Sequence, residues 1–218
     1  MKTKLPRRDV LQLLGVGVVG WGASQLFQLT APIGTDVRTN SFAAGVLADT
    51  DVPASKAPGA DLTLAVFTDY FCPVCKLSDT ALDEAVAEDG RVHVLYKDWP
   101  ILSQLSEHVA RVVLATHPQG IYEKLRARLM RDRRWFDDRI LQEMVEDLGG
   151  SWHKTLSALH DDEPEITRRL VRNQREAFGL GLSGTPGFLI GPLLVNKGLT
   201  AREFARAFDR AREIAASG

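Results

Sequence analysis

The chain has 218 residues, of which 44% are hydrophobic and 25% are charged, a composition that is ordinary for a globular protein and excludes a wholly disordered one. This length predicts one domain of about 100 to 200 residues together with a leader and a linker. The formal net charge is −1 and no dense basic face stands out, so the sequence argues against a nucleic-acid partner.

Residues 1–30 have the layout of an export signal, in which basic residues precede an apolar stretch from Val10 to Ala23. The basic residues are Lys2, Lys4, Arg7 and Arg8. The pair Arg7-Arg8, followed by Leu11, resembles a twin-arginine signal, although Gln12 departs from it. We predict a signal or anchor segment that is either cleaved or kept in the inner membrane, and in both cases a periplasmic domain.

Residues 31–60 are rich in Pro, Gly, Ser, Thr and Asp and have little periodicity, so we predict a linker with one short helix around 42–47. The domain is expected at 61–218. Residues 61–67 predict a buried strand, 73–88 a helix that ends at Asp89-Gly90, and 92–96 a second strand parallel to the first.

Residues 105–179 contain no convincing strand and predict a block of helices, because their apolar residues recur at helical spacing. Two short apolar runs, 188–190 and 193–195, flank Gly191-Pro192 and predict a hairpin. An amphipathic helix is expected at 201–216. The order strand, helix, strand, helical block, two strands, helix indicates an α/β fold.

The chain has only two cysteines, Cys72 and Cys75, and they lie between the first strand and the first helix. Pro73 suits the first helical turn, which places Cys72 at the N-cap. There the unpaired backbone N–H groups and the helix dipole favour an anion, so the pKa of Cys72 should fall below the free value of about 8.5. Cys75, one turn deeper, should stay protonated longer and resolve the mixed disulfide that Cys72 forms with a substrate.

Two other interpretations of the pair remain open. It is either half of a zinc site or two inert core cysteines, but the five histidines have no paired spacing that would complete a zinc site. Only His153 and His160 could share a helical face. Redox chemistry is the preferred interpretation, with no metal and no cofactor other than a Cys72–Cys75 disulfide. Asp69, three residues before Cys72, either relays a proton to Cys75 or, as is more usual for such a residue, caps a turn or faces solvent.

Three segments resemble the DsbA-like family of thioredoxin-fold oxidoreductases. Residues 67–76 are similar to its active-site segment, 96–102 to its second strand and exit, and 181–188 to its cis-proline segment. The resemblance spans about 62–213. It implies a thioredoxin fold with a helical insertion at about 103–180.

The resemblance also implies that Pro186 is cis and faces the cysteines, and that the Thr185 backbone pairs with an extended substrate peptide beside Cys72. Pro73 and Val74 are then expected to contact substrate too. Val74 departs from the family's best-known oxidase, which has histidine there. Because valine has no donor to stabilise a thiolate, we expect a less acidic Cys72 and a milder oxidant.

The function predicted from these features is thiol–disulfide exchange on exported proteins, as an oxidase or isomerase. The expected partners are cysteine-containing exported proteins and a membrane or soluble redox partner. Two alternatives are a disulfide reductase that serves one client and a non-enzymatic binding module on a thioredoxin scaffold, although the binding module would have no need of two cysteines.

Overall fold

The structure, a computed structural model, describes residues 32–55 and 57–217. The predicted signal segment at 1–30 therefore lies outside the described residues. Residues from Gly34 onward form one unit, which contains both cysteines. In the described ranges, no helix combines the length and apolar character needed to cross a bilayer.

A six-stranded sheet with the order β1-β6-β5-β3-β4-β2 lies at the centre of this unit. The strands are β1 (Thr35–Asp36), β2 (Ala54–Ser55), β3 (Leu62–Thr68), β4 (Val92–Asp98), β5 (Gly187–Ile190) and β6 (Leu193–Val195). The central pair β3 and β4 is parallel and the other neighbours are antiparallel. Every residue of β3 except Thr63 is buried, as expected for a strand covered on both faces.

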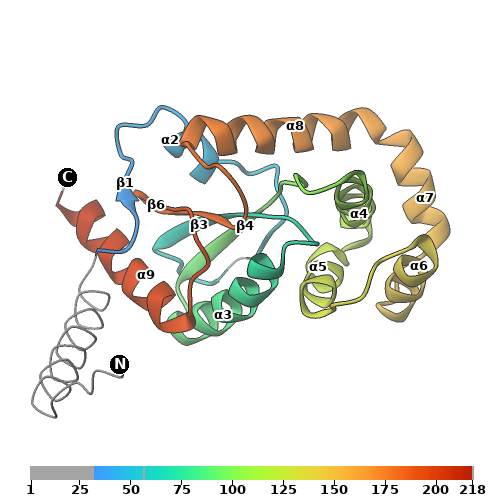
Figure 1. Ribbon diagram of the computed structural model, residues 1–218, viewed down its shortest axis with the longest axis horizontal. Helices are drawn as coiled ribbons and strands as arrows, with labels where there is room; N and C mark the ends of the chain where they lie inside the picture. Colours follow the sequence, from blue (N-terminus) through green and yellow to red (C-terminus); the bar gives the residue numbers. More distant parts are fainter. Residues whose placement is uncertain (1–31, 56, 218) are drawn as a thin grey trace, which may run out of the picture. The chain divides into compact units, whose positions relative to one another are not determined.

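The α-helices of the described part are α2 (Ala43–Leu47), α3 (Pro73–Asp89), α4 (Gln104–Ala115), α5 (Tyr122–Arg131), α6 (Asp138–Asp147), α7 (Trp152–Asp161), α8 (Glu163–Leu180) and α9 (Ala201–Ala216). Helices α3 and α9 pack on one face of the sheet, and α2 and α8 lie on the other (Figure 1). Helices α4 to α7 lie beyond the end of the sheet that carries the carboxyl end of β4 (Figure 1).

These elements confirm the predicted α/β thioredoxin fold with a helical insertion. The insertion runs from α4 to α8, close to the predicted range 103–180, and α9 has the predicted bounds. Helix α3 ends where Gly90 adopts a left-handed conformation with φ of 71°, which glycine reaches without steric cost.

The linker prediction for 31–60 is wrong for much of that range. Strands β1 and β2 extend the two edges of the sheet, and α2, expected as a short helix, packs on it. The elements at the edges are only two residues long, too short to show periodicity in a sequence. Isolated apolar residues, among them Val46 and Val52, nevertheless bury their side chains in this part of the fold.

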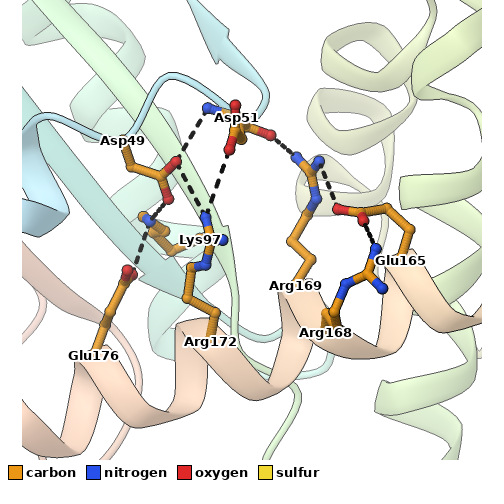
Figure 2. Close-up of polar contacts among 8 residues, drawn as sticks. All are labelled: Asp49, Asp51, Lys97, Glu165, Arg168, Arg169, Arg172 and Glu176. Atoms are coloured by element: carbon orange, nitrogen blue, oxygen red, sulfur yellow. Dashed lines mark hydrogen bonds and ion pairs between the residues drawn. The ribbon is translucent and has the colours of Figure 1, made fainter.

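A network of charges ties the loop after α2 to β4 and α8 (Figure 2). Lys97, on β4, is fully buried, and its Nζ lies 2.5 Å from Asp49 and 2.8 Å from Glu176 of α8. Around this centre, Arg172 approaches Asp49, and Arg169 donates to the backbone carbonyl of Asp51. The loop is thus held by buried ion pairs as well as by apolar contacts.

Candidate redox site

Cys72 is the N-cap of α3, as predicted, and Pro73 occupies the first turn. The Cys72 N–H donates to the Asp69 carbonyl at 3.1 Å, which closes a tight turn between β3 and α3. The Cys72 Sγ accepts from the Cys75 N–H at 3.2 Å. A negative charge on this sulfur would therefore lie at the positive end of a 17-residue helix, against a backbone donor.

The two thiols differ in pKa because their surroundings differ. Hydrogen bonding from the Cys75 side chain, supported by the Cys75 N–H and opposed by burial, lowers the pKa of Cys72 to about 6. Burial raises the pKa of Cys75 far above its usual value, and its hydrogen bond to Cys72 adds to the rise. Cys72 is consequently a thiolate for much of the time at neutral pH, whereas Cys75 keeps its proton.

The third part of the site comes from the loop before β5. The Thr185–Pro186 peptide bond is cis, and the Cys72 thiol donates to the Thr185 carbonyl at 3.5 Å. The structure thus brings together residues that lie 113 positions apart in the sequence. Val74 is 47% exposed on the first turn of α3, while Pro186 is buried. The predicted site residues therefore form one cluster around the Cys72 sulfur.

Asp69 has a supporting position in this cluster. Its carboxylate is buried and accepts the backbone N–H of Phe71 at 2.8 Å. It also accepts the N–H groups of Ile101 and Leu102 at 2.9 and 3.0 Å. Asp69 therefore joins the turn before Cys72 to the loop after β4, which is the predicted capping role.

A buried polar group beneath the turn was not predicted from the sequence. The hydroxyl groups of Tyr70 and Tyr122 donate to the carboxylate of Asp98 at 2.7 and 2.9 Å. Burial raises the pKa of Asp98 to about 6, although the two tyrosine hydroxyls act in the opposite direction. Because Tyr70 lies two residues before Cys72, this group fixes the turn from below. No periodicity marks such a group, because its members lie on a turn, a strand and a helix.

The described residues give no support to the zinc-site interpretation of the cysteine pair. Within 32–55 and 57–217, no group of three or more His, Cys, Asp and Glu side chains is arranged to hold a metal ion. Both cysteines are free thiols.

Residues 63–207, more than half of the chain, match the family model described as the DSBA-like thioredoxin domain. The chain belongs to this family. Its members are thiol–disulfide oxidoreductases, and the cysteine pair lies where the matched domain begins. No match was found among curated proteins.

Solved structures agree with this DSBA-like assignment. A thioredoxin-like oxidoreductase from Silicibacter pomeroyi is 28% identical, with a TM-score of 0.72 over 77% of this chain and 96% of that one. The thiol-disulfide exchange protein alpha-DsbA2 from Wolbachia pipientis shares the fold at 21% identity, with a TM-score of 0.73 over 79% and 95%. A periplasmic thioredoxin-like protein from Salmonella enterica is 26% identical, with a TM-score of 0.64 over 79% and 96%.

A first prediction concerns the acidity of Cys72 in this DSBA-like domain. The thiolate absorbance at 240 nm of the reduced protein should titrate at about pH 6, and the Cys72→Ser variant should lose that transition. The lowered pKa stabilises the reduced folded state; this contribution is fully present above the usual thiol value of about 8.5 and is lost as the pH falls to about 6. A transition between pH 8 and 9 would show that the helix start does not stabilise the thiolate.

A second prediction concerns Asp98. Its folded pKa is raised, so the protonated carboxyl stabilises the fold below about pH 4, and that contribution is lost as the pH rises through about 6. The test compares the free energies of unfolding of the native chain and of Asp98→Asn. The stability of the native chain relative to the variant should fall by about 2–3 kcal/mol between pH 4 and 7.5. Urea unfolding at several pH values measures this difference, in which the other titrating groups cancel. A difference that does not change with pH would show that the pKa of Asp98 is not raised in the folded protein.

Proposed function

We propose that this chain catalyses thiol–disulfide exchange on exported proteins, as an oxidase or isomerase, through the Cys72–Cys75 pair. The observation that carries the proposal is the position of the Cys72 sulfur. It lies at the start of α3, 3.2 Å from the Cys75 N–H and 3.5 Å from the Thr185 carbonyl. A low-pKa sulfur, a protonated sulfur one turn behind it and an adjacent backbone edge are the parts that disulfide exchange needs.

The oxidising reaction begins with a substrate thiolate that attacks Cys72 in the Cys72–Cys75 disulfide. The S–S bond between the cysteines breaks, a substrate–Cys72 bond forms, and the Cys75 thiolate takes up a proton. A second substrate thiolate then attacks the substrate sulfur of the mixed disulfide and releases Cys72 as a thiolate. Two electrons pass from the substrate dithiol to the cysteine pair, and a disulfide-bearing redox partner must remove them before the next cycle.

The local chemistry favours a moderate oxidant. A lower pKa makes Cys72 a better leaving group in the second step and stabilises the reduced pair, which raises the reduction potential. The Cys72 pKa of about 6 lies between that of a free thiol, about 8.5, and that of the most acidic family members, about 3.5. Val74 contributes no hydrogen-bond donor or charge from its side chain. Its backbone N–H supports the thiolate, but less than the groups of Cys75 do.

Substrate binding and localisation are part of the same proposal. The Thr185 backbone would pair with an extended peptide, beside which Pro73 and Val74 lie exposed, and such main-chain pairing gives broad specificity. The basic and apolar start of the sequence supports export to the periplasm, either as a soluble protein or held by that segment. The similar structure from Salmonella enterica is of a periplasmic protein.

Two assays on the full domain separate the activities. In the first, the oxidised protein is mixed with a reduced, unfolded substrate, and disulfide formation is followed by alkylation and mass spectrometry. In the second, the reduced protein is mixed with a substrate whose disulfides are scrambled, and recovery of substrate activity is measured. Acceleration in the first assay indicates an oxidase and in the second an isomerase. If neither reaction is faster than with free glutathione, the proposed function is wrong.

A further inference from the structure

A hollow of 640 Å³ opens directly beside the redox pair. One wall is the turn before α3 and the start of that helix, with Phe71, Pro73 and Leu77, and the other is the segment 130–135 at and after the end of α5. Phe71 and Pro73 are the chain neighbours of Cys72, so the hollow begins next to the reactive sulfur. The opposite side of α3 is covered, because the Leu199 N–H donates to Ser78 at 3.1 Å.

Two neighbouring stripes of α3 differ in what lies against them. Val74 and Ser78 are four residues apart, and a Cβ on Gly198 would come within 2.8 Å of both side chains, so the 196–199 loop packs against that stripe of the helix and leaves only Val74 partly exposed. Pro73 and Leu77 form the neighbouring stripe and face the hollow. A peptide joined to Cys72 and lying along Thr185 therefore has an open path on the side of Leu77.

Four basic side chains line the hollow and no acidic side chain does. They are Lys76, Arg131, Arg133 and Arg134. Arg131 pairs with Asp83 and Arg134 with Asp132, both at 2.6 Å, while Lys76 donates to a backbone carbonyl and has the carboxylates of Asp69 and Asp132 nearby.

Arg133 differs from the other three basic residues. In the described ranges it has no ion pair and no hydrogen bond, and its side chain is exposed at the mouth of the hollow. Among the basic side chains that line the hollow, Arg133 is therefore the one without a carboxylate partner. One unpaired cation is far too little for a nucleic acid, but it suits a single carboxylate.

The apolar part of the hollow has an unusual composition for a free surface. Trp135 is 74% exposed and Leu77 66%, and the Trp135 ring lies against Phe71 with a centroid distance of 5.2 Å. Phe136, the next residue, is buried and also contacts Phe71, at 5.4 Å. These contacts anchor the segment that carries Arg133. Exposed aromatic surface next to an unpaired arginine is typical of protein-binding sites.

We propose that the hollow binds an acidic side chain of the substrate polypeptide, a few residues from the substrate cysteine, through Arg133, with the peptide chain lying against Trp135 and Leu77. This inference rests on the proposed function, because it describes how the same site selects among its substrates. The substrates it favours are exported proteins with Asp or Glu close to a cysteine.

Pairs of dithiol peptides test the proposal. Two peptides are identical except that three Glu residues in one, and three Lys residues in the other, follow the first cysteine. The second-order rate constant for their oxidation by the oxidised domain is measured at pH 7 and low salt. Each rate is divided by the rate of the same peptide with hydroxyethyl disulfide, which removes the effect of the flanking charges on the peptide thiol itself.

The native domain should oxidise the Glu peptide about five- to tenfold faster than the Lys peptide, and 0.5 M salt should reduce this ratio. Arg133→Glu should abolish or reverse the ratio. The matched control is Arg175→Glu, which makes the same charge change on the exposed side of α8. That control should keep the native ratio.

Equal corrected rates for the two peptides with the native domain would overturn the proposal, as would a native ratio in Arg133→Glu. An equal loss of the ratio in Arg175→Glu would also overturn it, because the preference would then follow net charge and not this hollow. If the native domain oxidises neither peptide, the proposed function itself fails, and this outcome differs from oxidation without a preference.

Discussion

Cys72→Ser should lower the rate of thiol–disulfide exchange by more than about 100-fold, to the background level, because only a thiolate attacks or leaves in this reaction. Cys75→Ser should behave differently. Its Cys72 still reacts once with a substrate disulfide, but no second sulfur resolves the product. A mixed disulfide between the protein and its substrate should therefore accumulate, and it can be measured by mass spectrometry without reductant.

The chain suits this experiment because it has only two cysteines, so any bound substrate reports a single sulfur. Serine is close to cysteine in size, and Cys75 is fully buried, so the thermal unfolding of each variant should be compared with that of the native chain. The opposite result, in which Cys75→Ser is inert and Cys72→Ser forms the adduct, would contradict the assigned order of the two sulfurs.

Lys97→Met should lower the free energy of unfolding by about 3–5 kcal/mol, because it removes the buried cation between the carboxylates of Asp49 and Glu176 and leaves only the more exposed Arg172 near Asp49. Burial raises the pKa of Asp49, but the hydrogen bond and charge of Lys97 outweigh it and hold that pKa below its usual value. In the variant the carboxylates can be neutralised by protonation. The deficit relative to the native chain should therefore shrink as the pH falls from 7 to 4.

Lys197→Met is a matched control for this prediction. Lys197 lies 3.0 Å from Glu203, but its side chain is 59% exposed, so the same substitution removes an ion pair from the surface. We expect a loss of about 0–1 kcal/mol, with little dependence on pH. Urea unfolding of both variants measures the two values. Similar losses for Lys97→Met and Lys197→Met would show that burial does not strengthen the Lys97 network.

Much of the fold follows from local patterns that a single sequence displays. The continuous apolar run of β3, the helical spacing after Pro73 and the terminal helix starting after Thr200 each have the length at which periodicity is informative. The Thr200–Glu203 capping box, present in the structure, is the kind of signal that makes such a boundary sharp. By contrast, β1 and β2 have two residues each and exist only because an edge of the sheet is available to them.

The residues of the candidate site likewise include some that the sequence predicts and others that only the folded structure brings together. Cys72 and Cys75 could be predicted because their spacing and position carry the chemistry, and Thr185 and Pro186 through the resemblance. The sequence around Arg133 and Trp135 shows a basic run followed by two aromatic residues, which by itself does not tell a solvated helix end from a docking surface. Their place beside Cys72 depends on packing against Phe71 across 64 positions of sequence. Such contacts are tertiary and leave no periodic trace.

The reduction potential of the Cys72–Cys75 couple, measured by equilibration with glutathione buffers at pH 7, tests the central claim most directly. A helix-capped Cys72 with a pKa of about 6 predicts an intramolecular disulfide with a potential between about −120 mV, the value of a strong oxidant, and about −270 mV, that of a reductant. Failure of the two cysteines to form that disulfide in any buffer would contradict the account.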